Sequence, residues 1–270
     1  GSWTQFQFMK HALLAVLLAA PTFGLLSTLV VSNRMAFFSD AISHSAFAGI
    51  AFGFLLHQAV TQFNFDPRIA MVLLGVLVGL GIAVVRRRTD LSNDTVIGVF
   101  FSTVVAIGIA IITASPRFAQ QEFPRYLYGS ILTLDDADLY LSGILAVAIL
   151  AFMVVSFNSL MLLGMNDELA HSRGIRVRLY DYVFSMLLAL VIMVLIRTAG
   201  ILLVTAMLVV PAAAARNLAR SVGGMFWWAT VIALLASVVG TMISFSDTFG
   251  NVGTGAMIVL AAAVMFGVSL

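Results

Sequence analysis

The sequence predicts an all-α fold, a polytopic bundle of transmembrane helices. Apolar residues make up 61% of the 270-residue chain and charged residues only 10%, whereas soluble domains average about 45–50% and about 25%. Unbroken apolar runs recur along the whole chain, and most are close to the roughly 17–25 residues that a helix needs to cross a bilayer. These observations exclude a soluble enzyme, and no hydrophilic stretch is long enough to form a separate catalytic or receptor domain.

We expect nine spans in a single transmembrane domain covering residues 1–270. Each expected span is an apolar run, and the runs are 11–32, 36–57, 68–85, 94–114, 138–163, 182–197, 199–215, 225–245 and 252–270. The sixth and seventh runs are short and are separated only by Arg197 and Thr198, so the alternative is a re-entrant hairpin in their place and eight spans in all. Gly1 and Ser2, without a starting Met, are interpreted as a scar of tag removal.

Basic residues between the runs orient the bundle, because Lys and Arg are enriched in cytoplasmic loops. Successive connections between spans lie on alternate sides of the membrane. If Arg86–Arg88 are placed in the cytoplasm, nine of the 14 basic residues lie there and five lie outside. The C-terminus is then expected in the cytoplasm. The net charge is only +2 and the basic residues form short clusters, which argues against a nucleic-acid partner. Without cysteine the chain cannot form a thiolate metal site.

The second run contains Asp40 and His44, although an ionisable group costs roughly 2.5–3.5 kcal/mol at the centre of a span. Residues four apart lie on one face of a helix with about 5–6 Å between their Cβ atoms, so one divalent ion can bridge the two side chains. A carboxylate and an imidazole suit zinc, manganese or ferrous iron. Two ligands are too few for a closed site, so a second copy of the chain or water must complete the shell.

Two other interpretations of this pair stay open. Ser39 and Asp40 are good N-cap residues, and in a helix that begins here Asp40 would satisfy backbone N–H groups near the headgroups, while His44 would be a hydrogen-bonded packing residue. Alternatively, the pair is a proton relay.

The loop 164–180 is expected to contain a short helix between the fifth and sixth runs. Asp167 and Glu168 begin this helix, Arg173 closes it and Gly174 ends it, so its charges match the helix macrodipole. A capped cytoplasmic helix is suited to docking a soluble partner. The alternative is a basic loop that forms a helix without any partner.

Pro211 lies inside the seventh run. Proline within a span frees a carbonyl group and kinks the helix, so Pro211 marks either a moving element of the bundle or a packing bend. Two glycine pairs, Gly49 with Gly53 and Gly75 with Gly79, predict close helix packing, because small residues four apart let two backbones approach each other.

Three of these segments together resemble the permease subunit of the bacterial zinc/manganese ABC importers, the ABC-3 type. Arg34–Ser45 contains the aspartate and the histidine, separated by three residues, that mark the second span of that family. Ala199–Arg216 is similar to its second hallmark, and Asp167–Arg178 is similar to its coupling helix. The resemblance covers essentially the whole chain. Residues 247–255 depart from it, because relatives usually show a shorter turn with Pro and Gly there, and the role of this outer loop stays open.

The resemblance implies a multi-pass homodimeric permease of the bacterial cytoplasmic (inner) membrane. Its partners would be cytosolic ABC ATPase subunits, a second permease copy and an extracytoplasmic metal-binding protein. The residues that the resemblance assigns to ATPase coupling are Asp167, Glu168, Arg173, Gly174 and Arg176. It places Asp40 and His44 in the path of the transported ion.

The expected cargo is a divalent metal, Zn²⁺ first and Mn²⁺ next, with no intrinsic cofactor. The chain has no Gly-x-x-x-x-Gly-Lys-Ser/Thr loop, so we expect ATP to be hydrolysed on a separate subunit and the chain itself not to be an enzyme. The alternatives are Mn²⁺ or Fe²⁺ import by the same architecture, and a secondary metal transporter driven by protons through Asp40.

Overall fold

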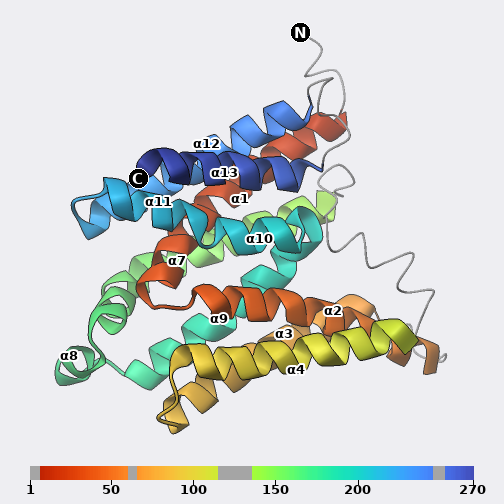
Figure 1. The fold of residues 1–270 in the computed structure, drawn as a ribbon, viewed down its shortest axis with the longest axis horizontal. Helices are drawn as coiled ribbons and strands as arrows, with labels where there is room; N and C mark the ends of the chain where they lie inside the picture. The colour runs from red at the N-terminus through yellow and green to blue at the C-terminus, as the bar shows by residue number, and fades with distance from the viewer. Residues whose placement is uncertain (1–6, 60–65, 115–135, 246–252) are drawn as a thin grey trace.

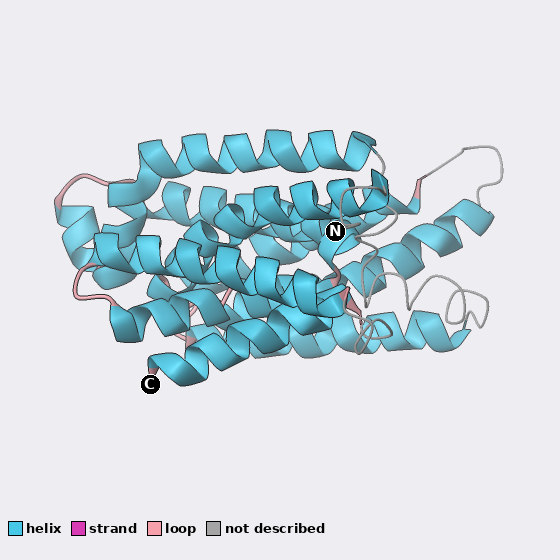
Figure 2. Cartoon of the chain, turned by 90° about the horizontal axis from the view of Figure 1, so that it is seen from above, coloured by secondary structure: helices cyan, strands magenta, loops and turns pink. Residues whose placement is uncertain are grey.

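The computed structural model describes residues 7–59, 66–114, 136–245 and 253–270, and the regular structure in these ranges is entirely helical. The long helices lie side by side along one direction in an elongated bundle (Figure 1), and Figure 2 shows the same arrangement from above. The helices are α1 (Gln7–Ser32), α2 (Ala36–Ala59), α3 (Pro67–Arg88), α4 (Asn93–Ala114), α7 (Asp136–Met165), α8 (Asp167–Ser172), α9 (Val177–Ala199), α10 (Ile201–Met207), α11 (Val210–Leu218), α12 (Val222–Ser244) and α13 (Thr254–Ser269).

The predicted apolar runs coincide with helices to within a few residues at their ends, but the predicted count of nine spans is not confirmed. Among the described residues, six helices are long and apolar enough to cross a membrane, and α7, which is bent, makes a seventh if it is counted as one span. Two further apolar stretches have 10–17 residues each and fall short of the length required of a span. They are Ala19–Ser32, the second part of α1, and Thr254–Ser269, which is α13. The all-α class of the fold is as predicted.

The sixth run is longer than the sequence suggested. α9 has 23 residues, so it is long enough to cross a bilayer alone, and Gly200 with φ of 82° separates it from α10. Val177–Ile196 and Ile201–Leu218 each qualify as a separate candidate span. Both segments are therefore long and apolar enough to cross a membrane, and the choice between two crossings and a re-entrant hairpin stays a prediction.

Pro211 lies in the first turn of a helix, directly after an interruption of the seventh run. α10 ends at Met207 and α11 begins at Val210, so Pro211 occupies the first turn of α11. Proline fits there because the N–H groups of the first turn have no intrahelical acceptor. Helical geometry is interrupted at Leu208 and Val209, just before the proline, within the candidate span Ile201–Leu218, and the role of this interruption as a moving element or a packing bend stays a prediction.

Glycines hold α2 and α3 in very close contact. A Cβ atom added at Gly49 would lie 2.7 Å from the Cα of Met71, and one added at Gly53 would lie 2.7 Å from the Cα of Pro67. The same α3 meets α9 on another side, where a Cβ at Gly79 would lie 3.0 Å from that of Ala189. The close packing predicted from the glycine spacing is confirmed, and α3 connects α2 with α9.

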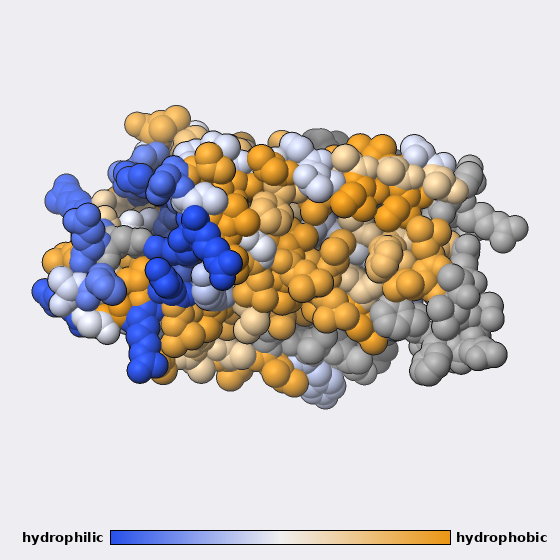
Figure 3. All heavy atoms as spheres, turned by 90° about the horizontal axis from the view of Figure 1, so that it is seen from below, coloured by the Kyte–Doolittle hydropathy of each residue, from blue (hydrophilic) through white to orange (hydrophobic). Residues whose placement is uncertain are grey.

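Polar and charged side chains gather at one end of the bundle, whereas apolar atoms cover most of the remaining coloured surface (Figure 3). The α1–α2 connection, the end of α3, the start of α4 and the end of α7 meet there around one cavity. The three arginines Arg86–Arg88 form the last turn of α3, where cations suit the negative end of the helix dipole. This gathering agrees with a common side for the basic clusters, while the cytoplasmic placement of the C-terminus stays a prediction. The interpreted tag scar and most of the 247–255 loop lie outside the described residues.

Candidate functional site

Asp40 and His44 both lie within α2, beyond its first turn. The helix begins at Ala36, so neither Ser39 nor Asp40 occupies the N-cap position. The hydroxyl of Ser39 instead donates to the carbonyl oxygen of Ala36 at 2.7 Å. The capping role that was one interpretation of Asp40 therefore finds no support in the geometry of this helix.

The two side chains face each other, as the spacing of four residues predicts. The Nδ1 atom of His44 lies 3.0 Å from the backbone oxygen of Asp40 and 3.5 Å from its carboxylate oxygen Oδ1. With the proton on Nδ1, the ring donates to that backbone oxygen, and Nε2 keeps a free lone pair. A ring nitrogen anchored in this way leaves the other nitrogen correctly oriented to bind a metal ion.

The pair is half-buried on the side of the protomer where α2 meets α4. The side chain of His44 is 32% exposed and that of Asp40 is 40% exposed, and Phe37, one turn earlier, is 64% exposed. The ring of Phe101 from α4 packs edge-on against the imidazole, with ring centroids 5.2 Å apart. One side of the pair is therefore walled by an aromatic residue, and the other opens onto the protomer surface.

The Asp40–His44 pair is an incomplete metal site within one chain. Across the part of the chain that the structure describes, no three His, Cys, Asp or Glu residues gather closely enough to hold an ion. Zinc sites in proteins usually have at least three protein ligands. Two ligands that open onto a surface can bind an ion only with help from water or from a second molecule, which suits transient binding.

The loop after α7 folds as a short capped helix, α8. Its N-cap is Asn166, whose side-chain oxygen accepts from the N–H of Leu169 at 3.0 Å. Arg173 is the C-cap, and Gly174 follows with φ of 73°, a left-handed conformation that glycine adopts without strain. The expected short helix and its glycine stop are therefore present, and the sequence had not identified Asn166 as the cap.

An open groove of about 1000 Å³ surrounds this loop. The predicted docking residues Glu168, Gly174 and Arg176 line it, whereas Asp167 begins α8 and its side chain lies outside the described part of the structure. Arg173 is exposed at the end of the helix. The structure thus brings the loop residues together at the polar end of the bundle, and the lining of their groove includes neither Asp40 nor His44.

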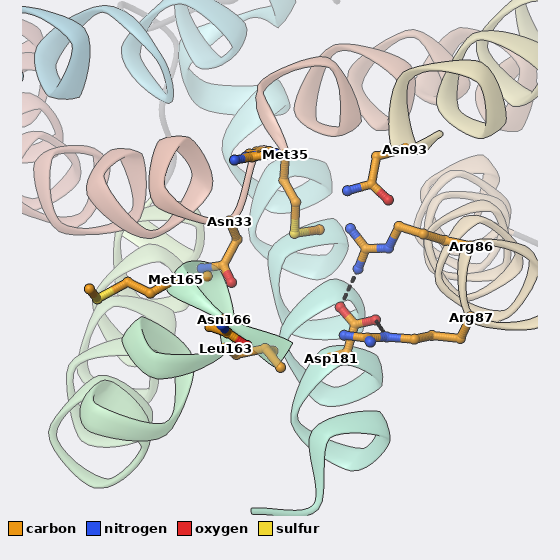
Figure 4. Close-up of a pocket in the computed structure, with 11 residues that line it drawn as sticks. Asn33, Met35, Arg86, Arg87, Asn93, Leu163, Met165, Asn166 and Asp181 are labelled. Atoms are coloured by element: carbon orange, nitrogen blue, oxygen red, sulfur yellow. Dashed lines mark hydrogen bonds and ion pairs between the residues drawn. The ribbon is translucent and has the colours of Figure 1, made fainter. Parts of the chain in front are cut away.

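Sequence reasoning missed a buried ion-pair cluster at the same end. Asp181 of α9 accepts hydrogen bonds from Arg86 and Arg87 of α3, with 2.7 Å between Nε of Arg87 and Oδ2 of Asp181. Figure 4 shows the three side chains meeting beside a cavity of about 330 Å³. The available signal was a lone carboxylate directly before the sixth apolar run, but its partners are more than 90 residues away in sequence.

Pro211 is buried at the start of α11, and α10, which precedes it, packs against α2. α2 carries Asp40 and His44, so the break between α10 and α11 directly follows a helix that contacts the one carrying this pair. The structure does not bring Pro211 itself into the pair.

Comparisons with known proteins agree with this architecture. Residues 5–270 match the family described as the ABC 3 transport family. The manganese import system permease protein ScaB of Streptococcus parasanguinis is 31% identical over 98% of this chain and 90% of its own length. The high-affinity zinc uptake system membrane protein ZnuB of Haemophilus influenzae is 28% identical over 98% of this chain and 97% of its own length.

A solved structure has the same fold over nearly the entire chain. It is PsaBC from Streptococcus pneumoniae in complex with Fab, and the match has a TM-score of 0.82 with 29% identity, covering 99% of this chain and 92% of that one. The resemblance inferred from the three sequence segments is confirmed. A polytopic helical bundle, a match along almost its whole length and a near-complete structural overlap together show that this chain belongs to the ABC 3 transport family.

Proposed function

We propose that the chain is the permease subunit of an ATP-driven importer for a divalent transition metal, and that Asp40 and His44 form a transient station on the path of the ion. The observation that carries this proposal is the half-buried carboxylate–imidazole pair in a helix that otherwise reads as a membrane span. Ionisable groups at such positions are expensive and usually functional. The family membership and the names of the relatives, which import manganese or zinc, support the same conclusion.

A second copy of the chain completes the station in this proposal. One protomer offers two ligands, and both open onto the α2–α4 side of its surface. If two protomers meet on this side, two carboxylates and two imidazoles surround one ion, which matches the four ligands that zinc prefers. A homodimer is therefore the assembly that the site chemistry favours.

Zinc is the proposed first cargo, and manganese is the next. A mixed oxygen and nitrogen ligand set binds Zn²⁺, Mn²⁺ and Fe²⁺, and affinity rises from manganese through iron to zinc. The relatives include both manganese and zinc systems. ATP-dependent accumulation of radioactive Zn²⁺, Mn²⁺ and Fe²⁺, each measured separately in proteoliposomes, distinguishes the three, because only an ion that is transported accumulates.

The energy is proposed to come from cytosolic ABC ATPase subunits that dock in the groove around α8, with Glu168, Arg173 and Arg176 at the contact and Asp167 and Gly174 shaping the loop. An extracytoplasmic metal-binding protein would deliver the ion on the other side of the inner membrane. The C-terminus would then lie in the cytoplasm with the basic clusters. The break before Pro211 is proposed as a point where the helix pair α10 and α11 can move during gating.

The decisive experiment is metal uptake into proteoliposomes containing the permease and its ATPase. His44→Ala should lower ATP-dependent uptake at least tenfold, while Leu235→Ala, at an exposed residue of α12, should leave it unchanged. Uptake that persists without ATP under a proton gradient would instead favour the secondary transporter. If His44→Ala transports as well as the unmodified chain, the proposed station is wrong.

A further inference from the structure

The Asp181 cluster ties the first turns of α9 to the last turn of α3. The carboxylate of Asp181 is only 4% exposed, and its two oxygens accept from different arginines, Arg86 and Arg87. Arg86 is itself 8% exposed. A buried carboxylate held on both oxygens by two guanidinium groups is a rigid contact, because charge-assisted hydrogen bonds are short and directional.

This contact lies directly behind the loop that carries α8. Asp181 is in the second turn of α9, and α9 begins at Val177, immediately after the loop. Arg87 lines the cavity beside Asp181 (Figure 4). It also lines the groove around α8. Force applied to the loop therefore reaches Asp181 along fewer than two turns of helix, and reaches α3 through the two arginines.

α3 continues the connection to α2, which carries Asp40 and His44. The backbones of α2 and α3 touch at Gly49 and Gly53 with no space for a methyl group. Ile42, which lies between Asp40 and His44 in sequence, approaches α3 at Gly79, where its Cδ1 is 3.4 Å from the position of an added Cβ. A displacement of α3 must therefore move α2 or break this packing, since packed interiors transmit strain.

We propose that Asp181 is the positioning residue that makes α9 and α3 move as one body, so that movement of the docking loop reaches the ion-binding helix. This inference rests on the proposed function, and it adds a route between its two sites. Asp181 contacts neither the ion nor the ATPase in this scheme. It acts through Arg86 and Arg87, and its contribution is the stiffness of the α3–α9 contact.

The test measures metal ions transported per ATP hydrolysed in proteoliposomes with the ATPase bound. Asp181→Asn keeps the shape of the side chain and removes its charge, so hydrolysis should stay within about twofold while uptake falls at least tenfold. The ratio then falls at least fivefold. Asp181→Glu restores the carboxylate and should recover part of that ratio. Asp94→Asn, at an exposed carboxylate in the first turn of α4, is the matched control and should keep the native ratio.

A merely structural role predicts a different result. If Asp181→Asn lowers uptake and hydrolysis together and the ratio stays native, the inference is overturned. Failure of the proposed function is distinguishable, because the unmodified complex would then hydrolyse ATP without accumulating any metal. Loss of coupling only in the Asp181 variant leaves the proposed function intact.

A second measurement needs no change at Asp181, so it remains informative if the variant does not fold. The chain has no cysteine, and Leu77 of α3 and Met186 of α9 are exposed, so Leu77→Cys with Met186→Cys accepts two spin labels at known positions. The intramolecular distance between the labels should be the same in the nucleotide-free and ATP-bound complex. A distance that changes between these states would show that α3 and α9 slide, and would overturn the proposal.

Discussion

Two clusters in this chain join a carboxylate to basic side chains, and they differ mainly in how deeply the protomer buries them. Asp40 and His44 sit on one helix with side chains 40% and 32% exposed, and the imidazole nitrogen lies 3.5 Å from the carboxylate. Asp181 joins two helices, is 4% exposed and meets two guanidinium groups at hydrogen-bonding distance. The first cluster is open and the second is closed.

The difference separates two uses of the same chemistry. In the open pair, Nε2 of His44 and the exposed side of the Asp40 carboxylate remain available to an incoming ion. In the closed cluster both carboxylate oxygens are engaged, so Asp181 has little left to offer a ligand. Burying a carboxylate costs free energy. In this chain we assign one carboxylate to transient ion binding and the other to a rigid contact between two helices.

Removing the buried carboxylate should give the largest loss of stability. Asp181→Leu leaves two arginines facing each other without their shared acceptor, and breaking one side of a buried ion pair costs roughly 3–5 kcal/mol. Thermal unfolding of the purified permease in detergent measures the change. The matched control is Arg68→Ala, which breaks the exposed pair of Arg68 with Asp66, 3.7 Å apart, and should cost at most about 1 kcal/mol.

Equal shifts for Asp181→Leu and Arg68→Ala would contradict the distinction between a closed and an open cluster. They would mean that water and relaxation reach Asp181 far more easily than its 4% exposure indicates.

The open pair should show the reverse behaviour, with a large effect on transport and a small one on stability. Asp40→Asn keeps the shape of the side chain but weakens its binding of a divalent cation, so uptake should fall at least tenfold, which corresponds to about 1.4 kcal/mol. Its unfolding temperature should stay close to that of the native chain, because the side chain is 40% exposed. Uptake and thermal unfolding of the same preparation provide the comparison.

A fall in stability as large as that of Asp181→Leu, with transport per folded molecule unchanged, would identify Asp40 as a structural residue. The Asp40–His44 pair would then serve stability, as the Asp181 cluster does, and the proposed difference between the two clusters would be wrong.

Local sequence patterns predicted the open pair but not the closed one. The face shared by Asp40 and His44 follows from a spacing of four on any helix, and the long apolar runs fix the helices themselves. The contact of Asp181 with Arg86 crosses 95 residues and depends on α3 packing against α9. No local pattern specifies which of several similar apolar helices are neighbours.

The start of the sixth span and the interruption of the seventh differ in detail from what the sequence predicted. The sixth span was expected to begin at residue 182, after Asp181, because a charged residue normally ends an apolar run. α9 begins at Val177 and so includes Asp181, whose charge is compensated by Arg86 and Arg87 of α3. In the seventh run a proline kink was expected at Pro211, and the helix is interrupted at Leu208 and Val209, because a proline lacks the N–H that would bond four residues back and its ring crowds the carbonyl group there.

The docking loop offers the smallest predicted effect, and it tests whether the short helix matters on its own. α8 has only six residues, fewer than an isolated helix needs, so its geometry depends on its cap. Asn166→Ala removes the acceptor for the N–H of Leu169 and should cost about 1 kcal/mol locally. Binding of the ATPase to the permease, measured by titration, should weaken about fivefold, since 1 kcal/mol corresponds to that factor.

Asn166→Asp retains a capping oxygen and should bind the ATPase as the native chain does. If the alanine and aspartate variants bind equally well, the loop docks without a preformed helix, and the stiff element that transmits movement must begin at α9 itself. That outcome would confine the rigid route to the Asp181 cluster and α3. Weaker binding by the alanine variant would instead show that the rigid route begins at α8. The effect is small, but it determines whether the route from the ATPase to α3 includes the short helix.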